Sequence, residues 1–98
     1  MADLLVLEFA HSNAAEMYRS VNQALGLGGP GDPSGWPGAM GCHVAGQAGD
    51  SLIVVEVWDS KAAQEEFMQK DLGPALQKAN APAPTRAEWF SMLGDMHR

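Results

Sequence analysis

The sequence predicts one small α+β domain, with its elements in the order strand, helix, strand, strand, helix, strand. Three observations lead to this fold class. Four segments carry the β-branched and alternating apolar residues typical of strands. Two longer segments carry apolar residues at helical spacing. The length of 98 residues suits one domain, so residues 1–98 are expected to form a single unit. This order is the split β-α-β arrangement of ferredoxin-like folds.

The first half of the chain supplies a strand, a helix and a long irregular segment. Asp3–Phe9 is short and rich in Leu and Val, which favours a strand. Asn13–Leu25 carries an apolar stripe, with Asn13 placed to cap the helix and Gly26 placed to end it. Leu27–Gly38 is rich in Gly and Pro and therefore predicts a loop.

The second half supplies a hairpin, a second helix and a last strand. Ala39–Gln47 and Leu52–Asp59 are predicted strands, and the loop Ala48–Ser51 between them is typical of a hairpin. A helix follows, and Gly73–Pro74 is expected to break or kink it. Arg86–Leu93 is the predicted last strand.

These elements predict an antiparallel sheet with one uncovered face. With right-handed crossovers the strands lie in the order 4-1-3-2, and both helices pack on the same face. The opposite face must be buried against something, and a second copy of the chain has the matching shape. We therefore expect a homodimer.

Alternation along the strands brings candidate site residues together. A hairpin folded symmetrically about Gly49–Asp50 places His43 opposite Glu56. We expect Glu8 of the first strand to share their face, with Trp58 one step along. On the third strand one face is aliphatic and the other is mixed: Ile53, Val55 and Val57 on the first, Leu52, Val54, Glu56 and Trp58 on the second.

His43 and Glu56 are the candidate catalytic pair. A carboxylate opposite an imidazole fixes the tautomer of the imidazole, as a general base requires. Two interpretations stay open: the pair contacts a ligand, or it satisfies itself inside a dimer interface and holds the strand register. If the pocket lies on the helix side, we expect the aliphatic set to line it and His43 to face the dimer instead. Parity alone does not decide between the two faces.

Aromatic residues supply the candidate substrate-binding surface. Trp58, Tyr18 and Trp36 could hold a flat aromatic ring beside the catalytic pair, with Glu8 close by. Trp36 lies in the predicted loop, where it is either a plug over one edge of the core or a lid over a ligand pocket.

Composition excludes several other classes of function. Twelve acidic residues against six scattered basic ones give a net charge of −6, which argues against nucleic acid and anionic membranes as partners. No segment has the length of a membrane span or the pattern of a signal peptide. A single cysteine, Cys42, suggests a reducing compartment, so we expect a cytoplasmic protein. No His, Cys or carboxylate set has metal-ligand spacing, so no metal is expected.

The motifs resemble one known family. The run Ile53–Ser60, then Phe67 and Leu72–Leu76, resembles the antibiotic biosynthesis monooxygenase-like members of the dimeric α+β barrel superfamily. Tyr18–Gly26 and Gly41–Gly46 also match the family pattern, so that the resemblance covers nearly the whole chain. It implies a homodimer whose two sheets pack face to face, with a small-molecule pocket in each subunit, usually between sheet and helices.

The resemblance also implies a range of functions. Relatives include cofactor-independent oxygenases of aromatic polyketides, polyketide cyclases, haem-degrading oxygenases and stress-induced proteins without known chemistry. The haem-binding positions correspond here to Phe67 and Gln77, which do not match, so no cofactor is expected. The function expected is therefore a cofactor-independent monooxygenase or cyclase acting on an aromatic or β-dicarbonyl substrate, with His43 as base and Glu56 assisting it. The alternative is a non-catalytic ligand-binding or stress-response homodimer.

Overall fold

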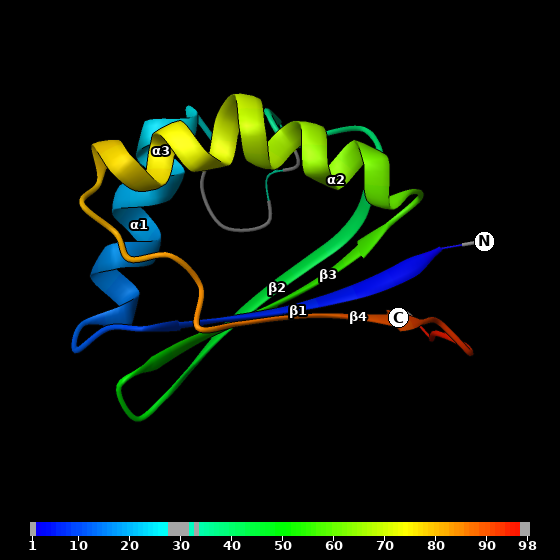
Figure 1. The fold of residues 1–98 in the computed structure, drawn as a ribbon, viewed down its shortest axis with the longest axis horizontal. Coiled ribbons are helices and arrows are strands. Elements are labelled where there is room, and N and C mark those ends of the chain that lie inside the picture. Colours follow the sequence, from blue (N-terminus) through cyan, green and yellow to red (C-terminus); the bar gives the residue numbers. More distant parts are fainter. Residues whose placement is uncertain (1, 28–31, 33, 97–98) are drawn as a thin grey trace.

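The computed structural model describes residues 2–27, 32 and 34–96, so part of the predicted loop, residues 28–31 and 33, lies outside it. A four-stranded antiparallel sheet carries all the helices on one face (Figure 1). The strand order is β2-β3-β1-β4, which confirms the predicted ferredoxin-like α+β fold. The strands are β1 Asp3–Ala10, β2 Met40–Ala48, β3 Ser51–Trp58 and β4 Arg86–Ser91; the helices are α1 Ala14–Leu25, α2 Lys61–Phe67, η1 Met68–Leu72 and α3 Gly73–Lys78.

Helix α1 has the ends that the sequence predicts. The side chain of Asn13 accepts a hydrogen bond from the backbone N–H of Glu16, at 3.3 Å, which satisfies one of the free donors of the first turn. Gly26 takes the left-handed conformation after the last turn, with φ of 74°. The apolar stripe of α1 is therefore fixed over the sheet, where Met17 and Val21 are buried.

The second helix does not break at Gly73–Pro74. Instead, α2, η1 and α3 follow one another without interruption, and η1 is a wide π-helical turn in which the N–H of Gly73 bonds to the carbonyl of Met68. A Cβ on residue 73 would lie 2.8 Å from that carbonyl oxygen, so glycine is required there. The wide turn lets Pro74, which has no N–H, continue the helix.

The hairpin between β2 and β3 has the predicted register. His43 pairs with Glu56 and Cys42 pairs with Val57. The connecting turn is shorter than predicted, because Ala48 and Ser51 already pair and only two residues separate them. Gly49 supplies the positive φ, 57°, that such a tight turn needs.

The two faces of the sheet are decided by burial. The mixed set of β3, which includes Glu56 and Trp58, is buried under the helices, whereas the aliphatic set around Val55 is only partly buried. A pocket on the helix side is therefore not lined by the aliphatic set. The aliphatic side chains lie on the face that none of the described helices covers (Figure 1). Leu4, Val6, Val44 and Phe90 extend this uncovered face.

Glu8 is a correction to the predicted cluster. The register between β1 and β3 places Glu8 opposite Ile53, so it points to the uncovered face and away from Glu56. There it accepts a hydrogen bond from Ser51 at 3.3 Å. The parity within β1 was readable from the sequence, but the offset between β1 and β3 was not, because no short turn joins these strands.

Candidate active site

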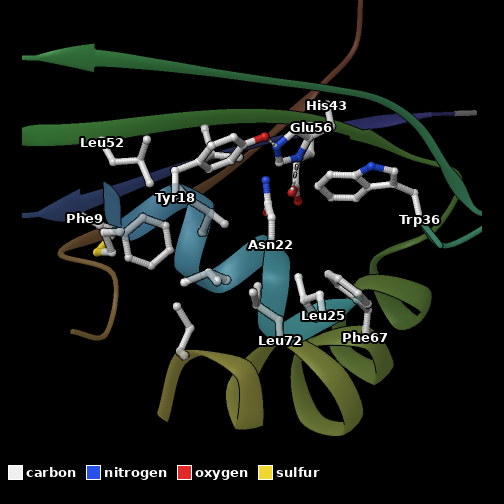
Figure 2. A pocket seen from close by; sticks show the side chains of 15 residues that line it. Phe9, Tyr18, Asn22, Leu25, Trp36, His43, Leu52, Glu56, Phe67 and Leu72 are labelled. Carbon is white, nitrogen blue, oxygen red and sulfur yellow. Dashed lines mark hydrogen bonds and ion pairs between the residues drawn. The ribbon is translucent and has the colours of Figure 1, made fainter. Parts of the chain in front are cut away.

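A cavity lies between the sheet and the helices (Figure 2). The space open to the centres of water molecules is about 40 Å³, and since one water needs roughly 10–15 Å³ on this measure, the cavity has room for about three waters. Most of its wall is apolar. It is lined by Leu7, Phe9, Met17, Tyr18, Val21, Asn22, Leu25, Trp36, His43, Leu52, Val54, Glu56, Phe67, Leu72 and Leu76.

A chain of hydrogen bonds runs along one end of this cavity. The hydroxyl oxygen of Tyr18 lies 2.8 Å from Nε2 of His43, and Nδ1 of His43 lies 3.0 Å from Oε2 of Glu56. The other carboxylate oxygen, Oε1, accepts a hydrogen bond from the indole N–H of Trp58 at 2.9 Å. Four side chains from α1, β2 and β3 therefore form one continuous relay.

The direction of the relay follows from the carboxylate. An ionised Glu56 can only accept hydrogen bonds, so Nδ1 of a neutral His43 carries the hydrogen and donates it. Nε2 is then the basic nitrogen, and it accepts the hydrogen of the Tyr18 hydroxyl. The lone pairs of the Tyr18 oxygen remain available to a group in the cavity.

The fold holds the relay in place. His43 and Glu56 face each other across paired strands, and Trp58 lies on the same face of β3, two residues after Glu56. Glu56 is only 3% exposed, so its charge would be costly without partners. Two donors, from His43 and Trp58, offset that cost, and among the described residues no buried side-chain nitrogen or oxygen lacks a partner.

Aromatic rings enclose the imidazole. The indole of Trp36 lies over His43 with ring centroids 4.3 Å apart and a tilt of 37°. The phenol ring of Tyr18 is nearly parallel to the imidazole, with centroids 5.8 Å apart. Trp36 therefore covers the imidazole on its side of the cavity (Figure 2).

Of the six predicted site residues, four line the cavity: His43, Glu56, Tyr18 and Trp36. Trp58 does not, because it is completely buried behind Glu56 and packs against Phe67 with centroids 5.8 Å apart. Its predicted substrate contact is therefore wrong, and its indole N–H instead fixes the carboxylate. Glu8, on the opposite face, is also remote from the cavity.

Comparison with known proteins rests on structure. No family model matches the sequence, and no curated protein is similar to it. Three solved structures superpose on nearly the whole chain. A protein of Chloroflexus aurantiacus, provisionally described as an antibiotic biosynthesis monooxygenase, is 11% identical with a TM-score of 0.71, over 99% of this chain and 98% of that one. Rv0793 of Mycobacterium tuberculosis is 12% identical with a TM-score of 0.67, over 99% and 100%.

A third structure carries the same provisional description. It comes from Deinococcus radiodurans, is 10% identical and has a TM-score of 0.63, over 100% of this chain and 98% of that one. The chain therefore shares the fold of these three structures. At these identities the likeness concerns the architecture, and the chemistry must be argued from the residues of the cavity.

Sequence reasoning missed one polar group of the site. Asn22 lines the cavity one helical turn after Tyr18. That spacing of four residues on α1 was a readable signal, since the side chain of Tyr18 already pointed to the same face. Phe9, Leu25 and Phe67 also line the cavity and were expected only as core residues.

The described residues give no sign of two other kinds of function. None of their His, Cys, Asp and Glu side chains gather in threes in a way that could hold a metal ion. None of the helices in the described part of the chain is long and apolar enough to cross a membrane.

Proposed function

We propose that the protein is a cofactor-independent enzyme of the monooxygenase or cyclase type, which removes a proton from a flat phenolic or β-dicarbonyl substrate. The observation that carries this proposal is the relay Tyr18–His43–Glu56 at the end of an apolar cavity. A basic nitrogen held in one tautomer by a buried carboxylate is the arrangement that general-base catalysis needs.

The proton transfer follows from the direction of the relay. A substrate hydroxyl or acidic C–H gives its proton to the Tyr18 oxygen, while the Tyr18 hydroxyl gives its own proton to Nε2 of His43. Tyr18 is therefore regenerated, His43 becomes an imidazolium, and Glu56 stabilises the new positive charge. Trp58 keeps Glu56 in place and does not touch the substrate.

The fate of the substrate anion separates the two reaction types. In a monooxygenase reaction, the carbanion form of the anion transfers an electron to dioxygen, which enters from solution as a co-substrate, and the substrate radical and superoxide combine to a peroxide anion. This peroxide takes the proton back from His43 through Tyr18 and loses water, so that one oxygen atom stays on the carbon as a carbonyl and the other leaves in the water. In a cyclase reaction, the carbanion attacks a carbonyl carbon of the same molecule, and the alkoxide that forms takes the proton back from His43 through Tyr18. Both reactions use the same base, so the relay supports them equally.

We also propose that the protein is a homodimer. Apolar residues of all four strands lie on the uncovered face, where Val44 is 59% and Phe90 is 41% exposed. A contiguous apolar face of this kind marks an interaction surface, and a second copy of the same sheet matches it in shape and polarity. The cavity lies on the other face of the sheet, so each subunit keeps its own site.

Turnover of a small substrate panel tests the enzyme proposal. Single-ring hydroquinones are followed by oxygen uptake, and linear β-polyketones by loss of their enol absorption. We expect His43→Ala and Tyr18→Phe to abolish activity, while the dimer stays folded by circular dichroism and sedimentation. Tyr18→Phe keeps the buried His43–Glu56 pair and is the safer variant for folding. Unchanged turnover in both variants would overturn the base assignment.

A non-catalytic ligand-binding dimer is the second candidate. The position of the Trp36 indole over His43 favours it, because the ring leaves room for only a few waters in the cavity. In this case the wild-type protein binds aromatic ligands in place of Trp36 and turns none of them over. Loss of the dimer in His43→Ala would further point to a structural role for the His43–Glu56 pair.

A further inference from the structure

Asn22 is a polar group in the cavity that the relay does not use. It lies on α1 four residues after Tyr18, so both side chains leave the helix on the same side. In Figure 2 its amide points toward the end of the cavity where Tyr18, His43 and Glu56 meet. The amide therefore faces the place where the substrate loses its proton.

The side-chain amide of Asn22 makes no hydrogen bond to any other described residue. Hydrogen bonds join the other polar side chains of the cavity to one another, but none of the bonds among the described residues uses this amide. No side-chain nitrogen or oxygen of the described residues is both buried and unpartnered. The amide is therefore open to the cavity, where a bound molecule can reach it.

The Asn22 amide is only partly buried, so water satisfies it in the free protein, and a ligand that displaces this water must pair with it in turn. Ten of its neighbours in the lining are aliphatic, sulfur-containing or phenylalanine side chains, which offer no partner: Leu7, Phe9, Met17, Val21, Leu25, Leu52, Val54, Phe67, Leu72 and Leu76. An amide has two N–H donors and one carbonyl acceptor, whichever way it is turned. A ligand that brings an oxygen acceptor next to Tyr18 satisfies this amide, and an all-carbon ligand leaves it unpaired.

We propose that Asn22 is a specificity-determining residue that donates a hydrogen bond to a carbonyl oxygen adjacent to the ionising hydroxyl of the substrate. This inference rests on the proposed function and narrows it to one substrate class. The Tyr18 oxygen, which donates to His43, accepts from the substrate hydroxyl. Asn22 offers N–H groups to the neighbouring oxygen. The matching ligand is a flat, apolar molecule with a hydroxyl beside a carbonyl, as in an ortho-hydroxyaryl ketone or the enol of a β-diketone.

The same contact assists the reaction. When the hydroxyl loses its proton, the negative charge spreads onto the adjacent carbonyl oxygen by conjugation. The hydrogen bond from Asn22 then goes to a partly charged acceptor, which strengthens it as the anion forms. Asn22 therefore stabilises the anion more than the neutral substrate, and a ligand without the carbonyl does not gain from it.

Three matched probes test the proposal on the full-length protein. Ortho-hydroxyacetophenone has both groups, phenol has the hydroxyl alone, and acetophenone has the carbonyl alone. Calorimetric titration gives the three affinities, and the long-wavelength absorption of the hydroxyacetophenone anion reports ionisation in the bound state. Wild type is expected to bind ortho-hydroxyacetophenone about tenfold more tightly than either single-group probe, as one well-placed hydrogen bond allows.

The variants separate Asn22 from the relay. Asn22→Leu, of similar size, is expected to lose most of the anion signal and to bind ortho-hydroxyacetophenone no more tightly than phenol. Asn22→Ser, whose hydroxyl does not reach as far, gives the same result if Asn22→Leu folds poorly. Tyr18→Phe should instead remove the preference for probes that carry a hydroxyl.

The outcomes are distinguishable. If wild type ionises bound ortho-hydroxyacetophenone and Asn22→Leu does so equally well, the assignment of Asn22 is overturned and the relay stands. If wild type shows no preference for hydroxyl-bearing probes and Tyr18→Phe changes nothing, the proposed function fails together with this inference.

Discussion

The substitution Glu56→Gln should reverse the hydrogen-bond relay without unfolding the protein. Glutamine has the shape of glutamate, and its carbonyl oxygen can still accept from the indole N–H of Trp58. Its NH₂ group then faces Nδ1 of His43 and donates to it. The hydrogen of a neutral imidazole must therefore move to Nε2, which now donates to the Tyr18 oxygen instead of accepting from it.

The expected magnitudes follow from the contacts of Glu56. Glu56→Gln still pairs the indole N–H of Trp58 and Nδ1 of His43, but the Tyr18 hydrogen and one amide hydrogen lack a protein acceptor, so its cost in free energy of unfolding should be about 1–2 kcal/mol. Glu56→Leu leaves the indole N–H of Trp58, which is completely buried, and Nδ1 of His43 without a partner. One unsatisfied buried group costs about 1–3 kcal/mol, so the two groups together should cost roughly 2–6 kcal/mol. The melting temperature should therefore fall by at least about 8 °C, since each kcal/mol lowers it by about 4 °C or more in a domain of this size.

Two measurements check the prediction, and neither needs the natural substrate. Urea unfolding of wild type, Glu56→Gln and Glu56→Leu gives the free energies of unfolding. Nitrogen-15 NMR of the imidazole distinguishes the protonated from the unprotonated ring nitrogen, so it reports the tautomer of His43 directly. Wild type should carry the hydrogen on Nδ1 and Glu56→Gln on Nε2. In addition, proton abstraction should fall by a factor of about 10⁴ in the glutamine variant, which is the loss in a Ser-His-Asp triad when an amide replaces the carboxylate and the histidine takes the wrong tautomer.

One spectroscopic result would refute the direction assigned to the relay. If wild-type His43 carried its hydrogen on Nε2 at neutral pH, Tyr18 would have to accept from it, and the basic nitrogen would face Glu56. Equal stability of Glu56→Leu and wild type would also contradict the role assigned to Glu56, because it would mean that neither donor depends on the carboxylate.

Further predictions concern the wide helical turn, the uncovered face and the aromatic cover. Gly73→Ala should cost about 1–3 kcal/mol in urea unfolding, because its Cβ would meet a backbone oxygen at 2.8 Å; Gly38→Ala, with nothing within 4 Å, is the control and should be neutral. Val55→Asp places a charge on the uncovered face and should give a monomer in sedimentation. The control Glu65→Gln, on the exposed side of α2, should leave the dimer intact. A monomeric wild type would contradict the dimer proposal. Trp36→Ala should bind phenol about tenfold more tightly in calorimetry by freeing the space over His43, and weaker binding would instead make Trp36 a ligand contact.

The sequence predicted the His43–Glu56 pair through local geometry. A two-residue turn at Gly49–Asp50 leaves little freedom in how two strands align, so the pairing of His43 with Glu56 follows from the position of the turn alone. Tyr18 was predicted for a similar reason, because its position on the apolar stripe of the helix follows from its spacing in the sequence. Interactions of this kind depend on neighbours in sequence or on one short turn.

The features that the sequence did not predict depend on long-range packing. The offset of β1 against β3 is set by how the whole sheet assembles, and it moved Glu8 to the opposite face. On β3, the side chains on the uncovered face are all aliphatic, apart from Ser51 at its start. The side chains that face the helices include a glutamate and a tryptophan. Hydrophobicity therefore does not distinguish a face covered by helices from one left for a partner. Trp58 was misjudged because its depth behind Glu56 depends on packing against Phe67.

The π-helical turn Met68–Leu72 keeps the side chains on either side of it directed at the cavity. Phe67 and Leu72 both line the cavity although they are five residues apart, a spacing that a regular α-helix would rotate by about 140°. Deleting a single residue here would leave the two side chains four residues apart on a regular helix, only about 40° beyond a full turn. The wide turn therefore adds one residue to the helix without turning the residues after it away from the cavity.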